Sequence, residues 1–198
     1  MSRKPSRPEM EMFLMKKNRI QLIDIIFAGV MAAMVYIVTL FRFPLLGSKV
    51  HFANAVCLLS GMLLGPVTGG FAAGLGSALY DAFGGGYDAL NVLITFVSKF
   101  AMAWVCGALM ERKGGRRFKL DRTVLSAVAG ALTYVALYML KSYITGAIAG
   151  NGWGVVAAKF PASIINAAAA IVAAPIFYHA VLPALQAGGM MKDGGSRR

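Results

Sequence analysis

Polar side chains recur at helical spacing within three apolar stretches of the sequence, and their types suit the binding of a small solute. Residues three, four or seven positions apart lie on one face of a helix, so each set forms a single stripe. The stripes contain Asn91, Thr95, Ser98 and Lys99; Tyr134, Tyr138 and Lys141; and Lys159, Ser163 and Asn166. Amide, hydroxyl, phenol and ammonium groups hold ligands by hydrogen bonds and charge. We therefore interpret the stripes as walls of one substrate-binding pocket.

The sequence offers little for catalysis. Acid–base chemistry usually needs clustered carboxylates or a histidine beside an acidic partner. Asp81 and Asp88 are separated by a triple-glycine turn, and His51 and His179 are expected on opposite sides of a membrane. An intramembrane lipid-modifying enzyme is therefore the least favoured alternative, and we predict no catalytic residue and no metal site.

Lys99 is the most informative polar residue because it lies near the middle of the apolar stretch 91–110. A charged side chain at the centre of a membrane helix costs at least about 2.5–3.5 kcal/mol. Snorkelling to lipid headgroups would account for Lys141 and Lys159, but it suits Lys99 less well. We expect that Lys99 is kept to meet a ligand.

The composition indicates a membrane protein. The 198 residues are 58% hydrophobic and only 14% charged, and the mean hydropathy is +0.67. A soluble domain of this size has too little interior for so much apolar surface. The net charge of +12 comes from basic residues that flank apolar runs, which favours membrane topology over nucleic-acid binding.

Six transmembrane helices are predicted, at about 21–41, 52–64, 67–83, 89–110, 123–142 and 157–180. Gly65 and Pro66 separate the second helix from the third, because proline cannot continue the helical hydrogen-bond ladder. The spacing of Gly61, Gly65 and Gly69 predicts close packing inside the chain more than a dimer face. The expected fold is an all-α integral membrane protein, a compact bundle of six helices.

The basic residues predict the orientation of the bundle. Most of the 20 basic residues fall in segments that are cytoplasmic if the N- and C-termini are both cytoplasmic. We therefore expect a cytoplasmic basic tail over 1–20, the membrane domain over 21–182 and a second cytoplasmic tail over 183–198. The location would be the cell membrane, with several passes.

The predicted pocket opens to the outside only. The inner halves of two helices, "AMAWVCGALM" at 101–110 and "AAAAIVAAPIF" at 167–177, carry almost no polar side chain. A bundle of this kind is open outward and sealed inward. Basic residues outnumber acidic ones at the outer face, which favours an anionic or acceptor-rich solute, and nearby aromatic side chains can stack on a planar ring.

The stretch "FRFPLLGSKVHFANAVCLLSGMLLGPVTGGFAAGLGSALYDAFGG" resembles the S components of energy-coupling factor (ECF) vitamin transporters, in particular the riboflavin, pyridoxine and hydroxymethylpyrimidine group. The resemblance extends from residue 21 to about 180. It implies the substrate-binding subunit of an ABC-type importer, which captures a water-soluble vitamin or precursor at high affinity and delivers it inward. The implied partners are a transmembrane coupling subunit and two ATP-binding subunits.

The same resemblance implies roles for individual segments. The loop at about 44–51 would be a gate, with Arg42, Lys49, His51 and Asn54, and the loop around 146–154 a second lid. Ala28 and Ala32 match an Ala-x-x-x-Ala motif that docks on the coupling subunit. The chain has no GxxxxGK[ST] phosphate-binding loop, so partner subunits would use the ATP and no cofactor is expected here.

A self-sufficient small-solute carrier or channel is the other alternative. Such proteins often contain inverted repeats with matching helix breaks. Here the break at Gly65-Pro66 has no counterpart, and the inner halves lack the polar residues that a channel needs. Copurification with ATP-binding subunits would discriminate between the two.

Overall fold

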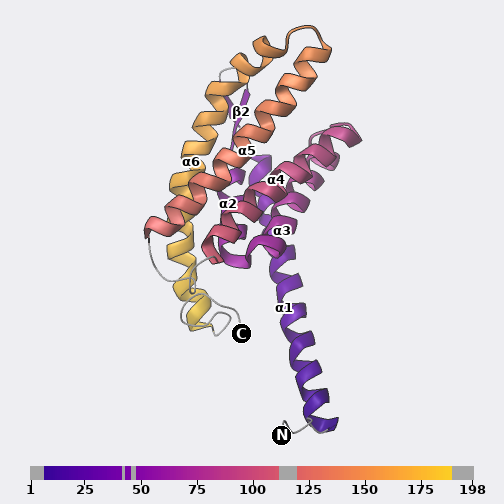
Figure 1. Ribbon diagram of the computed structural model, residues 1–198, viewed down its shortest axis with the longest axis vertical. Helices are drawn as coiled ribbons and strands as arrows, with labels where there is room; N and C mark the ends of the chain where they lie inside the picture. The colour runs from indigo at the N-terminus through magenta and orange to yellow at the C-terminus, as the bar shows by residue number, and fades with distance from the viewer. Residues whose placement is uncertain (1–6, 42, 46–47, 112–119, 189–198) are drawn as a thin grey trace, which may run out of the picture.

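The computed structural model describes residues 7–41, 43–45, 48–111 and 120–188, which are almost entirely helical (Figure 1). Its helices are α1 (Arg7–Leu40), α2 (Ala53–Leu64), α3 (Pro66–Leu79), α4 (Ala89–Glu111), α5 (Leu120–Ile148) and α6 (Gly152–Ala187). A π-helical turn, Tyr80–Gly84, continues α3. The predicted all-α fold with six helices is confirmed for the described part of the chain.

A short β-hairpin between α1 and α2 was not predicted. Strand β1 (Phe43–Leu45) pairs antiparallel with β2 (Ser48–Val50), and Phe43 lies opposite Val50 in the register. The hairpin occupies most of the segment that we expected as the gate loop. Strands of three residues are too short to leave a clear period-two pattern in a sequence.

Helix α2 forms the centre of the bundle. All of its residues are buried, and it packs against α1, α3, α4, α5 and α6. Leu58 and Met62 are completely covered. A helix that is apolar on every side must lie inside a protein or a membrane, and here the other helices surround it.

Small residues let these helices approach one another closely. A β-carbon added to Gly61 of α2 would collide with the carbonyl of Ala103 in α4, and one added to Gly76 of α3 would collide with the carbonyl of Ala32 in α1. Such backbone contacts are typical of helix packing in membranes. The glycine spacing therefore serves packing within the chain, as predicted.

The helix boundaries confirm some predictions and correct others. Gly65, at a φ of 80°, ends α2, and Pro66 is the first residue of α3, as expected. Helix α1 begins at Arg7, so the expected tail over 1–20 is helical from that residue onward. A helical tail is compatible with the expected cytoplasmic position of this segment, which stays a prediction.

The predicted lid around 146–154 is wrong as a loop, because α5 and α6 leave only residues 149–151 between them. Gly150 takes a φ of 82°, a left-handed conformation that glycine adopts readily. Asn151 caps α6: its side-chain oxygen accepts a hydrogen bond of 3.1 Å from the Gly154 amide. These two residues make a tight turn out of a glycine-rich stretch.

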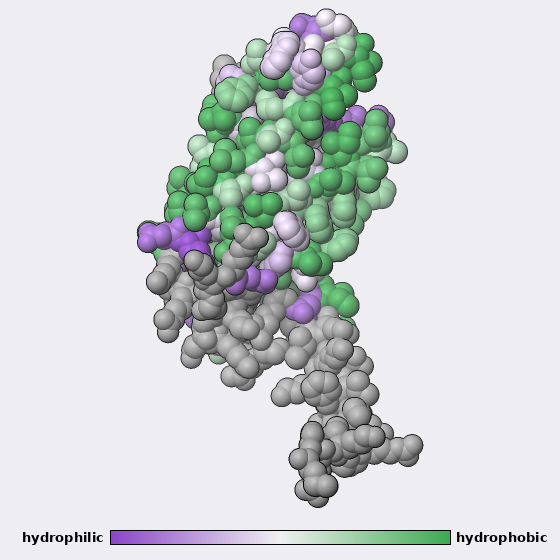
Figure 2. Space-filling view, in the orientation of Figure 1, coloured by the Kyte–Doolittle hydropathy of each residue, from purple (hydrophilic) through white to green (hydrophobic). Residues whose placement is uncertain are grey.

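Three helices, α4, α5 and α6, are long and apolar enough to cross a membrane by length and composition. Helices α2 and α3 have 12 and 14 residues, which cover only about 18 and 21 Å at 1.5 Å per residue. Helix α2 alone does not cross about 30 Å of hydrocarbon, in agreement with the short helix expected there, whereas α3 is lengthened by the π-helical turn that continues it. Figure 2 shows hydrophobic side chains over most of the visible flank of the bundle.

Candidate substrate-binding site

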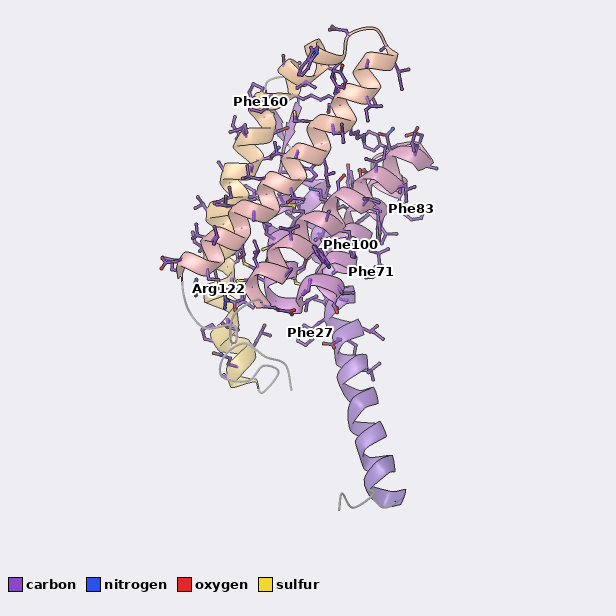
Figure 3. The ribbon with its side chains drawn as sticks, in the orientation of Figure 1. Phe27, Phe71, Phe83, Phe100, Arg122 and Phe160 are labelled. Carbon is purple, nitrogen blue, oxygen red and sulfur yellow. The ribbon has the colours of Figure 1, made fainter. Side chains whose placement is uncertain are left out.

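A cavity of about 660 Å³, open on one side, is lined by residues of α3, the π-helical turn, α4, α5 and α6, together with Thr39 of α1, His51 after β2 and Tyr87 before α4. The α4 and α6 residues come from the first half of each helix, whereas those of α5 come from Tyr134 onward. Figure 3 marks the two ends of the bundle, with Arg122 near the start of α5 and Phe160 near the start of α6. The cavity therefore lies toward the end of the bundle where α5 meets α6.

All eight residues that the sequence suggested as substrate-binding line this one cavity. They are Asn91, Thr95, Lys99, Tyr138, Lys141, Lys159, Ser163 and Asn166. The helical spacing places each stripe on one face, and the packing of α4 against α5 and of α5 against α6 turns the three faces toward one another. The structure thus brings these side chains together; their contact with a substrate stays a prediction.

Lys99 is held in place by two neighbours. Its ammonium group donates a hydrogen bond to the side-chain oxygen of Asn54, and it lies 3.8 Å from the centre of the Tyr134 ring. Only 3% of Lys99 is exposed. An aromatic face attracts a desolvated cation, and an ammonium has three N–H groups, so the hydrogen bond to Asn54 leaves further donors at the cavity wall.

The bundle below the cavity is packed with small and apolar side chains. Met102, Ala103, Cys106 and Met110 of α4 are completely covered, as is Ala174 of α6. The buried hydroxyls at this level, those of Thr123 and Ser126, donate to backbone carbonyls of their own helix, α5. In the part of the chain that the structure describes, this end of the bundle is therefore closed mainly by small and apolar side chains.

Two further lysines and two aromatic rings line the remaining wall. The rings of Tyr134 and Tyr138 are stacked, with centres 5.8 Å apart, and the Lys159 ammonium lies 5.8 Å from the centre of the Tyr138 ring. Lys141 is within electrostatic reach of both Lys159 and Asp81. The wall therefore combines flat apolar surfaces with positive charge.

The hairpin segment is tied to α6. The backbone amide of His51 donates a hydrogen bond of 3.0 Å to the side-chain oxygen of Asn166, and β2 packs against α6. His51 lines the cavity, and its role in a gate stays a prediction. Arg42 and the side chain of Lys49 lie outside the described residues. Asn54 is not a loop residue: it lies in the first turn of α2 and is buried.

Nine other residues line the cavity beyond the set that we named. They are Thr39, Ser77, Asp81, Tyr87, Ile94, Ser98, Tyr134, Ser142 and Thr145. Ser98 and Tyr134 belong to the predicted stripes, and Thr145 continues one of them at i+4 from Lys141. Asp81 depends on the π-helical turn, which changes the direction of side chains after Leu79 and has no recognisable sequence signal. Such turns often occur at functional sites.

A family model described as "ECF-type riboflavin transporter, S component" matches residues 19–182. The chain belongs to this family. A Pyrococcus woesei protein described as "Uncharacterized protein in gap 3'region" is 31% identical over 135 residues, which are 67% of this chain and 83% of that protein. The solved structure "Structure and mechanism of the S component of a bacterial ECF transporter" has a TM-score of 0.67 at 17% identity.

That structural match covers 84% of this S component and 99% of the solved chain, so the bundle described above is the S-component fold. S components are membrane-embedded transporter subunits and not enzymes, in agreement with the apolar helices of this chain. Within the described residues, no three His, Cys, Asp or Glu side chains gather where they could hold a metal ion.

The two alanines that we matched to a docking motif are not equally accessible in this S component. Ala32 is 4% exposed, because Gly76 of α3 packs on its backbone, and Ala28 is half-buried against the core. Gly29 and Ala33, one position further along α1, are exposed instead. The spacing of four is visible in the sequence, but which of the two adjacent faces of α1 points outward is decided by the packing of α3.

Proposed function

We propose that this S component is the high-affinity substrate-binding subunit of an ECF-type ABC importer in the plasma membrane. It captures a water-soluble vitamin or vitamin precursor from outside the cell, and partner subunits drive its delivery inward. The observation that carries the proposal is the single cavity in which polar side chains from α4, α5 and α6 converge above an apolar, tightly packed closed end.

Riboflavin is the first substrate to test, because it is the vitamin named in the description of the matching family. The cavity, at about 660 Å³, lies within the range of about 300–1,000 Å³ that is usual for small-molecule sites. The stacked rings of Tyr134 and Tyr138 suit a planar ring system, while Asn91 and Thr95 offer hydrogen bonds to its polar edge.

The proposed partners are a transmembrane coupling subunit and two ATP-binding subunits. The chain has no phosphate-binding loop motif of its own, and the described residues beyond the cavity are packed mainly with apolar side chains, which do not favour passage of a polar solute. A self-sufficient carrier or channel would need polar groups along that route. Release to the inside therefore requires a change that other subunits supply.

Two measurements on the full-length protein test the proposal. Mass spectrometry of protein purified in mild detergent, without added ligand, should find a bound vitamin, and added riboflavin should lose its fluorescence on binding. Affinity purification of the chain from its own membranes should recover ATP-binding subunits. Transport by the purified chain alone in vesicles, with no partner and no ATP, would contradict the proposal and favour a carrier.

A further inference from the structure

The charges on the cavity wall do not balance. Among the described lining residues, Lys99, Lys141 and Lys159 are cationic, and Asp81 is the carboxylate. The described wall thus has a net charge of two positive. A wall that only had to hold a neutral ring would need none of these lysines, because hydroxyl and amide groups suffice for neutral hydrogen-bond partners.

Lys99 already has a hydrogen-bond acceptor and a covering ring, whereas Lys141 and Lys159 lack partners this close. Asn54 accepts a hydrogen bond from Lys99, and the Tyr134 ring covers it at 3.8 Å. Lys159 has only the more distant Tyr138 ring, at 5.8 Å. Neither Lys141 nor Lys159 forms an ion pair with a carboxylate of the described residues, although Asp81 and Asp88 are within electrostatic reach of Lys141.

Two ammonium groups that share one half-buried cavity repel each other. Lys141 and Lys159 are each half-buried and within electrostatic reach of one another. Partly buried charges are screened less than exposed ones, so the repulsion persists at physiological salt. An anion between the two lysines would convert this repulsion into attraction and form charge-assisted hydrogen bonds.

Ser142 supplies a further donor next to Lys141. Its hydroxyl oxygen is buried and has no hydrogen-bond partner among the described residues, and Ser142 lines the cavity. Buried polar groups are nearly always paired in native proteins, so an unpaired one in a cavity wall indicates a missing partner. An anionic oxygen would accept this hydrogen bond.

We propose that the substrate carries a negatively charged group, a phosphate or a carboxylate, that lies between Lys141 and Lys159, with its ring against Tyr134 and Tyr138. The inference rests on the proposed function and specifies its substrate class: a planar vitamin-like molecule with an anionic substituent. Asp81 lines the same cavity within electrostatic reach of Lys141, so an anion bound between the lysines is disfavoured close to this carboxylate.

Matched flavins test the anionic group separately from the ring. Riboflavin and flavin mononucleotide have the same ring and differ by one phosphate. A flavin whose side chain ends in a carboxylate shows whether the site prefers a carboxylate to a phosphate. Binding of each to the purified full-length protein is measured by fluorescence quenching at several salt concentrations. The variants are Lys141→Gln with Lys159→Gln, and Arg122→Gln at the other end of α5 as a control for the loss of a cation.

The expected result is that one anionic flavin binds about tenfold or more tightly than riboflavin, since a hydrogen bond to a charged group contributes more than a neutral one. The ratio of the affinity for the anionic flavin to that for riboflavin should fall toward one in the double variant and at higher salt concentration. In Arg122→Gln this ratio should stay as in the wild-type protein. Equal or tighter binding of riboflavin would overturn the inference and leave the proposed function intact.

If no flavin binds, riboflavin is not the substrate, and the anion site between Lys141 and Lys159 is tested with inorganic phosphate alone. Thermal unfolding is then followed with millimolar phosphate. A higher midpoint in the wild-type protein and in Arg122→Gln, but not in the double variant, would support the anion site for a different ring. No shift in any of the three proteins would overturn it.

Discussion

Asn54 and Lys99, 45 positions apart in the sequence, are joined by a hydrogen bond between the side-chain oxygen of one and the ammonium group of the other. Asn54 lies in the central helix α2, and Lys99 lies in α4 at the cavity wall. The most deeply buried charge of the site is therefore anchored to the most deeply buried helix. This arrangement fixes the position of the ammonium before any ligand arrives, which reduces the cost of binding.

Lys99→Met should weaken ligand binding by about tenfold or more, because the variant removes a charged hydrogen-bond donor and keeps a long side chain. Membrane insertion and yield should not fall, since the change removes a buried charge. Binding of the vitamin identified by mass spectrometry is the measurement. Thr133→Val is the control, because Thr133 bonds to the Ala129 carbonyl of its own helix and does not line the cavity. Equal affinity of both variants would remove Lys99 from the site.

Asn54→Leu should lower stability by about 1–3 kcal/mol or more, because it leaves the Lys99 ammonium without its acceptor. Adding Lys99→Met to Asn54→Leu should recover much of the loss, as expected when an uncompensated buried charge causes it. Thermal unfolding of the two single variants and the double variant in detergent gives this comparison. Additive losses in the double variant would show that the two side chains act independently.

Asn166→Leu should speed ligand release, because the His51 amide would lose its acceptor and the hairpin its hydrogen bond to α6. Asn166→Asp keeps an oxygen acceptor at the same position and should release the ligand more slowly than Asn166→Leu. Stopped-flow dilution of the complex measures both dissociation rates. If the two variants release the ligand equally fast, the hydrogen bond does not hold the hairpin against α6.

Gly61→Ala should destabilise the bundle by about 1–3 kcal/mol, because the added β-carbon would overlap the Ala103 carbonyl and push α2 from α4. Gly29→Ala is the matched control: it introduces the same methyl group in α1, where no atom of a neighbouring element lies within 4 Å. Since alanine favours a helix over glycine by about 1 kcal/mol, this control should be neutral or stabilising. If Gly61→Ala and Gly29→Ala unfold at the same midpoint temperature, a packing role for Gly61 is excluded.

The number of helices and the pocket stripes could be predicted from the sequence because both depend on local regularities. Apolar runs of spanning length, the break at Gly65-Pro66 and polar spacing of three or four are visible without any tertiary information. The convergence of Lys99, Lys141 and Lys159 on one cavity followed from one further assumption, that polar stripes in lipid face inward.

Features set by tertiary contacts could not be predicted. Asn54 was assigned to the gate because it follows the loop at 44–51 closely in the sequence, whereas its partner Lys99 becomes visible only in the folded bundle. The β1–β2 hairpin depends on its packing against α6. Asp81 reaches the cavity through a π-helical turn, and Ala32 is covered because Gly76 leaves room for α1. Each of these outcomes depends on a neighbour far away in the sequence.

The tight turn at Gly150 and Asn151 has a consequence for selectivity. It joins α5 directly to α6 near the level of Lys141 and Lys159, and the two helices pack along their length. The distance between these two lysines is therefore set by the packing of the helices and depends little on the ligand. We expect the site to select ligands by size, so that an analogue too bulky for the space between the lysines is excluded by steric overlap even if it offers the same hydrogen bonds.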